Sequence, residues 1–210
     1  MKGFEESYFR DMYNNKYALH NPRYKFVKLL GLIKKKGKLL DVGCAFGRVL
    51  AVGKEIGYKT YGCDVSRFAV KACRKNGLQA RVCSIGELKY AKDSFDVVTV
   101  LDVIEHVKDI EGGLAEIRRV CRGDGLVLFV MPVYDGVTGK IVNMLDKDQT
   151  HINKFSRYEW LRMLSRQFEV VKWGGIMRYF FFNRWYLHYQ TQILRPITPA
   201  IFVLCKNKKV

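Results

Sequence analysis

Hydrophobic positions along the chain follow two alternating patterns. Short apolar runs rich in β-branched residues are typical of buried parallel strands, and apolar residues recurring every three or four positions indicate helices. The runs predict strands over residues 38–42, 60–65, 79–83, 95–101, 126–131, 168–173 and, last, 200–205. The recurring positions predict helices over residues 22–35, 48–56, 66–76 and 158–166, and one through Ile110, Leu114 and Ile117, while Arg122 to Gly125 read as a turn.

This order of elements predicts one α/β domain of 210 residues. Repeated strand–helix units need right-handed crossovers, which give a doubly wound sheet. We expect an N-terminal helical cap over residues 1–37, a ligand-binding core over 38–131 and an acceptor-side segment over 132–210. In such sheets ligands lie beyond the carboxyl ends of the strands, where the strand order switches.

Two parts of the chain are harder to assign. The segment 176–195 is aromatic and basic, with the string YFFFNRWY at 179–186. It could line an acceptor pocket, rest on a membrane interface, or form a helix buried on the sheet edge. Tyr8, Tyr13 and Tyr17 are spaced near a helical turn and could cap a ligand or pack on the domain.

The composition is that of a globular domain with an excess of positive charge. The chain is 49% hydrophobic and 27% charged, and its formal net charge is +17. No apolar stretch is long enough to span a bilayer, and the N-terminus lacks the apolar core of a signal peptide, so we expect a cytoplasmic protein with, at most, peripheral membrane contact. The positive field would attract polyanions, anionic membranes or acidic substrates, or would simply be a solvated surface.

The six cysteines do not form a C-x-x-C pair, which argues against a zinc site or a redox dithiol. Several lie within apolar runs, where we interpret them as small buried hydrophobic residues. Free thiols of this kind fit a reducing compartment.

The strongest chemical signal is the string LDVGCAFG at 40–47. Glycine lets the backbone approach a ligand without a Cβ clash, and the helix that follows turns its N-terminal amides toward that ligand. Asp64 ends the next strand, where its carboxylate could accept hydrogen bonds from a ribose diol. A dinucleotide fingerprint would read G-x-G-x-x-G, whereas D-x-G-x-x-x-G suits a ligand with an amino group and no pyrophosphate.

With Asp64 and the FDVV strand at 95–98, this string resembles those of class I S-adenosylmethionine-dependent methyltransferases. Over residues 20–207 the chain looks like that family, and three further strings are most similar to ubiquinone-biosynthesis O-methyltransferases: LHNPR at 19–23, LDVIEHV at 101–107 and THINKF at 150–155. The resemblance implies a Rossmann-like sheet of seven strands, the last one antiparallel, and S-adenosylmethionine as the cofactor.

The resemblance also implies roles for individual residues. Arg23 would bind the carboxylate of the cofactor, Gly43 would lie against its methionine part, and Leu101 would lie near the sulfonium. Guanidinium matches carboxylate in a bidentate fork, which agrees with the first assignment, although Arg23 could also be a surface arginine. The full candidate cofactor site is Arg23, Asp41, Gly43, Cys44, Ala45, Gly47, Asp64, Val65, Ser84, Ile85 and Leu101.

Two positions depart from the family pattern. Many relatives have glycine at the position of Ala45, so this loop is less permissive. Many also have an aspartate at the position of Ser84, where it would bind the adenine amine. Here the Ile85 amide and apolar packing could hold adenine, with weaker cofactor affinity as one outcome.

Methyl transfer to a hydroxyl needs a base, and histidine is the usual candidate near neutral pH. His106 follows the fourth strand and His151 follows the fifth, so either could be the base or have a structural role. Asp102, Glu105 and His106 could share one helical face and bind a divalent cation, as the resemblance suggests, but we favour a site without metal.

These features favour a methyltransferase that acts on a small-molecule acceptor, anionic or lipid-like, most simply on oxygen. The net charge keeps an RNA or DNA methyltransferase open. The LDVI string at 101–104 argues against that class, since enzymes that methylate base amino groups often carry Asn/Asp-Pro-Pro-aromatic there. A non-catalytic, cofactor-binding partner of another subunit is a third alternative.

Overall fold

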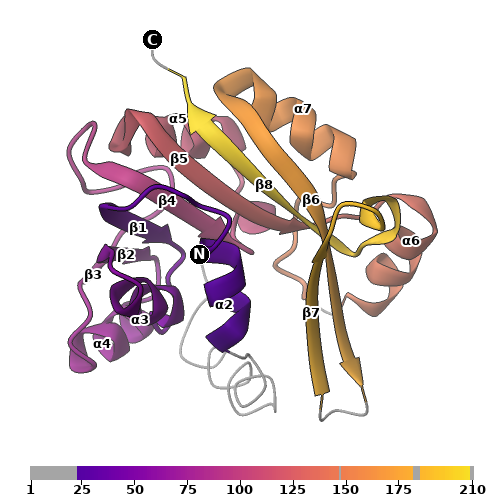
Figure 1. Cartoon of the computed structure of the whole chain (residues 1–210), viewed down its shortest axis with the longest axis horizontal. Coiled ribbons are helices and arrows are strands. Elements are labelled where there is room, and N and C mark those ends of the chain that lie inside the picture. Colours follow the sequence, from indigo (N-terminus) through magenta and orange to yellow (C-terminus); the bar gives the residue numbers. More distant parts are fainter. Residues whose placement is uncertain (1–22, 147, 182–184, 209–210) are drawn as a thin grey trace.

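The computed structural model describes residues 23–146, 148–181 and 185–208, and its elements are labelled in Figure 1. The helices are α2 (Arg23–Leu30), α3 (Arg48–Glu55), α4 (Arg67–Lys75), α5 (Ile110–Val120), α6 (Gly136–Leu145) and α7 (Arg157–Gln167), with short 3₁₀ turns η1 (Ile104–His106) and η2 (Arg195–Ile197). The strands are β1 (Lys38–Val42), β2 (Lys59–Asp64), β3 (Ala80–Val82), β4 (Phe95–Leu101), β5 (Cys121–Pro132), β6 (Phe168–Phe181), β7 (Trp185–Thr191) and β8 (Ala200–Asn207).

The strands form one mixed sheet in the order β3-β2-β1-β4-β5-β8-β6-β7. The first five are parallel, and β8 inserts antiparallel between β5 and β6. The order reverses between β1 and β4, so the topology places a ligand site at the carboxyl ends of these two strands. The Rossmann-like fold expected from the sequence is confirmed, with eight strands instead of seven.

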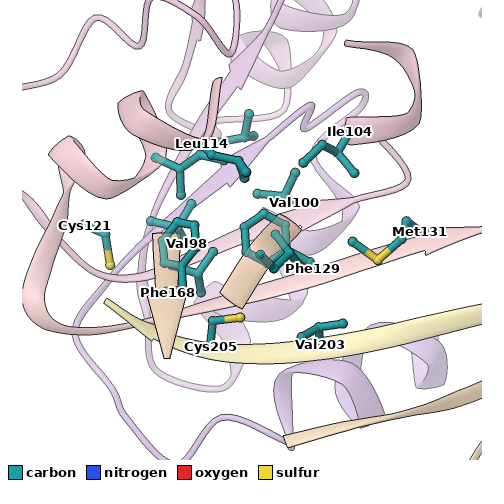
Figure 2. Close-up of a cluster of buried hydrophobic side chains, with 14 of the residues drawn as sticks. Val98, Val100, Ile104, Leu114, Cys121, Phe129, Met131, Phe168, Val203 and Cys205 are labelled. Carbon is teal, nitrogen blue, oxygen red and sulfur yellow. The ribbon is translucent and has the colours of Figure 1, made fainter. Parts of the chain in front are cut away.

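Helices cover the sheet on both faces. The side chains of β4 accordingly alternate between two buried clusters, one on each face. Val98 and Val100 join the cluster that includes Leu114 of α5 and Trp160 of α7. Val97 instead joins the cluster that includes residues of α2 and α3. Figure 2 shows the first cluster, with Phe129 and Phe168 packed edge to face at 5.6 Å between ring centroids.

Polar side chains of the residues just before three helices fix where these helices start. The Ser66 hydroxyl accepts from the Ala69 amide at α4, and the Asp109 carboxylate accepts from the Gly112 amide at α5. Ser156 and Glu159 form a capping box at α7. These caps end the loops that leave the carboxyl edge of the sheet, and so help to set the shape of that edge.

The second half of the chain departs from the sequence prediction. The segment 176–195 is not a helix: β6 runs to Phe181 and pairs with β7 in a hairpin that extends beyond the other strands (Figure 1). Residues 122–125, predicted as a turn, belong to β5. The helix α6 was not predicted, although Val137, Ile141 and Met144 recur at helical spacing.

Part of the predicted N-terminal cap, with Tyr8, Tyr13 and Tyr17, lies outside the described residues, as do the tip of the hairpin and residue 147. The predicted first helix is described from Arg23 and ends at Leu30, earlier than expected. None of the described helices combines the length and the apolar character needed to cross a membrane.

Candidate active site

The loop after β1 is built from left-handed backbone conformations. Gly43, Ala45 and Gly47 have φ values of 74°, 44° and 75°. A Cβ atom on Gly43 would lie 2.3 Å from Cγ2 of Val103, so only glycine fits between this loop and the segment after β4. Ala45 adopts a conformation that costs an L-residue roughly 1–2 kcal/mol. The predicted Gly-rich loop thus lies directly against the carboxyl end of β4.

Asp64 fixes this loop from the neighbouring strand. Its carboxylate oxygens accept hydrogen bonds from the amides of Ala45 and Ser66, each at 2.8 Å. The side chain is buried, and burial raises the pKa of Asp64 against the lowering effect of these bonds. Each oxygen keeps a second lone pair, so the carboxylate can still accept from hydroxyl groups of a ligand.

Asp41 is buried beneath the loop at the end of β1. Its Oδ1 accepts a hydrogen bond from the Thr99 hydroxyl of β4 at 2.7 Å. Burial, opposed by the Thr99 hydrogen bond and assisted by the charge of Asp64, raises the pKa of Asp41 to about 7. A carboxyl group of this pKa would gain from a positively charged partner, because the partner stabilises the ionised form.

The other predicted cofactor residues lie along the same edge, with one exception. Cys44 is buried, and Leu101 is half-buried at the end of β4. Ser84 and Ile85 follow β3, and Ile85 packs against Gly113 of α5. Arg23 is exposed, and its guanidinium pairs with Glu55 at the end of α3. Its assignment to the cofactor carboxylate stays a prediction.

The two candidate bases, His106 and His151, lie together, with their ring centroids 4.7 Å apart. His106 belongs to η1, and its Nδ1 lies 3.0 Å from the carbonyl oxygen of Thr150. A carbonyl can only accept, so Nδ1 carries the proton and Nε2 has a lone pair. Burial lowers the pKa of His106, which favours this neutral form.

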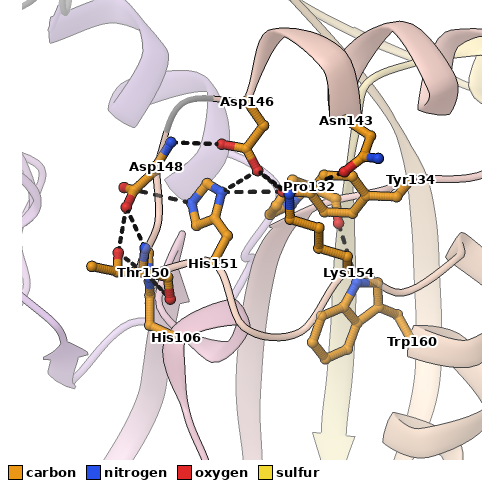
Figure 3. Close-up of polar contacts among 10 residues, drawn as sticks. All are labelled: His106, Pro132, Tyr134, Asn143, Asp146, Asp148, Thr150, His151, Lys154 and Trp160. Carbon is orange, nitrogen blue, oxygen red and sulfur yellow. Dashed lines mark hydrogen bonds and ion pairs between the residues drawn. The ribbon is translucent and has the colours of Figure 1, made fainter.

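His151 is held by a carboxylate that sequence reasoning missed (Figure 3). Its Nδ1 lies 2.9 Å from Oδ2 of Asp146, and that oxygen also accepts from the Tyr134 hydroxyl at 2.7 Å. Against the effect of burial, these hydrogen bonds hold the pKa of Asp146 below its ordinary value. Asp146 therefore orients the imidazole through Nδ1, the relation found in catalytic triads, and Nε2 lies 3.8 Å from Oδ2 of Asp148.

The candidate metal ligands predicted from the sequence do not all lie together. Among the described residues, Glu105, His106 and His151 offer ligand atoms within 4.8 Å of one another, which could hold a divalent cation. Glu105 is buried, and burial followed by the charge of Asp102 raises its pKa well above the ordinary value. Asp102 instead pairs with Arg178 at 2.8 Å. The trio predicted from helical spacing is thus replaced by one that includes His151.

The cysteines differ from expectation at one place. The sulfur atoms of Cys63 and Cys83 are bonded to each other, joining the end of β2 to the residue after β3. Free thiols were expected here, and the sequence gives no sign of the pair because parallel strand pairing alone brings the two residues together. Cys44, Cys73, Cys121 and Cys205 are free and buried, as expected of small hydrophobic side chains.

Comparisons with known proteins agree with this geometry. Residues 40–129 match a family described as a methyltransferase domain. The chain is 30% identical over 103 residues to the tRNA (carboxymethyluridine(34)-5-O)-methyltransferase of Xenopus tropicalis, covering 49% of this chain and 16% of that protein. It is 32% identical over 99 residues to the ubiquinone biosynthesis O-methyltransferase of Thiobacillus denitrificans, covering 44% and 43%.

The fold comparison extends over nearly the whole chain. A solved S-adenosylmethionine-dependent methyltransferase of Thermotoga maritima superposes with a TM-score of 0.73 at 15% identity, covering 96% of both chains. Residues 40–129 thus match the methyltransferase domain, and the fold is that of S-adenosylmethionine-dependent methyltransferases, which use S-adenosylmethionine as their cofactor. It spans less than two thirds of the length of both curated relatives.

Proposed function

We propose that this chain transfers a methyl group from S-adenosylmethionine to an oxygen atom of a small-molecule acceptor, with His151 as the general base. The observation that carries the proposal is the hydrogen bond from His151 Nδ1 to the buried Asp146 carboxylate. It supports a base role because it leaves Nε2 to take the acceptor proton. His106, whose ring is tilted by 44° against that of His151, is the alternative base.

The loop residues fit the proposed cofactor. Bound S-adenosylmethionine supplies an electrophilic methyl group on a sulfonium centre. Asp64 would accept from the ribose hydroxyls, Asp41 would face the positive methionine part, and Gly43 would let the backbone approach it. Ser84, Ile85 and Leu101 would line the adenine and sulfonium ends.

The remaining work of the protein is alignment and removal of a proton. Displacement at a methyl group requires the acceptor oxygen, the methyl carbon and the sulfur to lie in line. Holding the acceptor in this position contributes a large part of the rate enhancement. A positioned base adds typically 10²–10⁴-fold. Asp146 is a positioning residue in this scheme, because it acts on the acceptor only through the His151 ring.

A second candidate is methylation of RNA. Two observations favour it: the formal net charge of +17 and the similarity to a protein named as a tRNA methyltransferase. A phosphate backbone would bind such a surface in a strongly salt-dependent way. The third alternative, a non-catalytic cofactor-binding subunit, rests on the Ala45 and Ser84 departures.

One experiment separates these candidates. The purified chain is incubated with methyl-labelled S-adenosylmethionine and a cell extract divided into RNA and small-molecule fractions, and the labelled product is identified. Our proposal predicts label in an ether or ester of a small molecule. Label in RNA would favour the second candidate, and cofactor binding without any labelled product would favour the third.

A further inference from the structure

A pocket of about 390 Å³ lies at the β3 edge of the sheet, away from the cofactor loop. Its lining includes Tyr61, Arg74, Arg81, Tyr90 and the turn at 77–79. These residues come from the first half of β2, the end of α4, the edge strand β3 and the segment that leads to β4. In Figure 1 this edge of the sheet, with β3 and α4, lies at the lower left.

Backbone carbonyl groups and an aromatic ring hold the two guanidinium groups of the pocket in place. Arg74 donates from Nε to the Ala80 carbonyl oxygen at 2.9 Å. Arg81 donates from Nη1 to the Lys89 carbonyl oxygen at 2.8 Å, and its guanidinium lies 4.9 Å from the centroid of the Tyr90 ring. Burial raises the pKa of Tyr90 to about 12, and the charges of Arg81 and Arg74 oppose this rise, so both cations lie near its hydroxyl. Two oriented guanidinium groups therefore converge on one pocket.

Positive side chains continue from the pocket along the solvent face of α4. This helix has no acidic residue, and its exposed cations are Arg67, Lys71, Arg74 and Lys75. Glu87, the acidic residue nearest to β3 in the sequence, is not among the residues that line the pocket. Among the described residues, the exposed large hydrophobic side chains all lie on other elements. A cationic surface without apolar side chains to insert favours a chain of phosphates over a membrane.

We propose that this pocket and the exposed face of α4 bind the phosphate backbone of a single-stranded nucleic acid. Arg74 and Arg81 would hold one phosphate group, because guanidinium matches phosphate oxygens in a bidentate fork. Lys71 and Lys75 would contact the phosphates that follow. Aromatic rings beside cations are typical of sites for single strands. The surface is separate from the proposed methyl-transfer site, since the pocket adjoins the first half of β2 and the cofactor loop adjoins its end at Asp64.

Fluorescence anisotropy of a labelled oligouridylate of about 12 nucleotides, at several NaCl concentrations, measures this binding. The variant with Arg74→Gln and Arg81→Gln should bind about tenfold more weakly, and its salt slope should fall by about 1.4, the value for two lost phosphate contacts on a single strand. Lysine at both positions should restore the slope but only part of the affinity. The control with Arg162→Gln and Arg166→Gln, two exposed arginines of α7 at the other end of the sheet, should change neither quantity.

A second variant protects the test against misfolding of the pocket, which thermal melts detect. Lys71→Gln with Lys75→Gln changes only exposed side chains of α4 and should also lower the affinity and the salt slope.

Three results would overturn the proposal. The first is an oligouridylate affinity that is absent in wild type, or equally affected by the α4 variants and the α7 control. The second is competition by inorganic phosphate as effective, per phosphate, as that by unlabelled oligouridylate, which would indicate a site for a single phosphate group. The third is loss of binding to phosphatidylserine vesicles without loss of oligouridylate binding in the arginine variant, which would assign the surface to a membrane.

Discussion

The carboxylate of Asp146 lies 2.9 Å from Nδ1 of His151, and the same oxygen accepts from Tyr134. If His151 is the base, Asp146→Asn and His151→Ala should each lower kcat by about 10²–10⁴-fold, because the first disturbs the tautomer and the second removes the base. Binding of S-adenosylhomocysteine should change by less than about twofold, since neither residue belongs to the predicted cofactor site. Single-turnover methyl transfer and calorimetry measure the two effects.

The neighbouring histidine, His106, provides the comparison for this prediction. His106→Ala should cost much less activity than His151→Ala, and Lys172→Met, an exposed residue of β6, should cost none. The reverse ranking of the two histidines would assign the base to His106.

Asp41 should make folding stability depend on pH in a defined window. Its pKa is about 7 in the folded protein, above the ordinary value of 3.8 that an unfolded chain shows, so between these values the folded state holds a proton that the unfolded state has released. Stability from this group is therefore fully present below about pH 4 and falls by roughly 1.4 kcal/mol per unit as pH rises toward 7.

Urea unfolding of wild type and Asp41→Asn at several pH values isolates this contribution. The asparagine does not titrate, so the difference in unfolding free energy between the two proteins should shift steadily in favour of the variant from pH 4 to 7. A constant difference across that range would show that Asp41 does not have a raised pKa.

Replacing Ala45 with glycine should raise the stability of the folded protein. Its φ of 44° is costly for alanine and free for glycine, so Ala45→Gly should raise the free energy of unfolding by on the order of 1 kcal/mol without loss of cofactor affinity. Ala51→Gly on α3 is the matched control, expected to lower stability by about 1 kcal/mol because its backbone is helical. Equal destabilisation by both substitutions would mean that residue 45 is not strained.

Trp160 anchors α7 to the sheet. The side chain is fully buried, packs against Phe155 at 4.9 Å between ring centroids, and donates from Nε1 to the Pro132 carbonyl oxygen. Trp160→Ala should cost about 3–5 kcal/mol of unfolding free energy. Tyr158→Ala on the same helix, 71% exposed, should cost less than about 0.5 kcal/mol. Similar denaturant midpoints for the two variants would contradict this packing.

The parallel half of the fold could be predicted because local pattern and tertiary position agree there. The strands 38–42 and 95–101 match the structure to the residue, since each is a mostly apolar run in which nearly every residue is buried. The β6–β7 hairpin was missed because its residues do not alternate in polarity. Its two strands are held by their pairing with each other, which the local sequence pattern does not show.

The candidate site could likewise be predicted only in part. The loop around Gly43 and the carboxylate of Asp64 can be found from spacing, because the contact between them follows from the order of adjacent strands. The partner of His151 could not be found, since nothing in the local sequence shows that the residue after α6, Asp146, lies against the imidazole. Nor could the pairing of Asp102 with Arg178, 76 residues apart, because it depends on how far β6 extends beyond the sheet.

The most direct test of the account is a calorimetric titration of S-adenosylhomocysteine into wild type, Asp64→Asn and the exposed control Glu169→Gln, with NAD⁺ as a competing ligand class. We predict binding to wild type and to the control, none of NAD⁺, and at least tenfold weaker binding to Asp64→Asn in a protein that still melts cooperatively. Equal affinity of wild type and Asp64→Asn, or binding of NAD⁺ in place of S-adenosylhomocysteine, would contradict the assignment of this loop to the methyl donor.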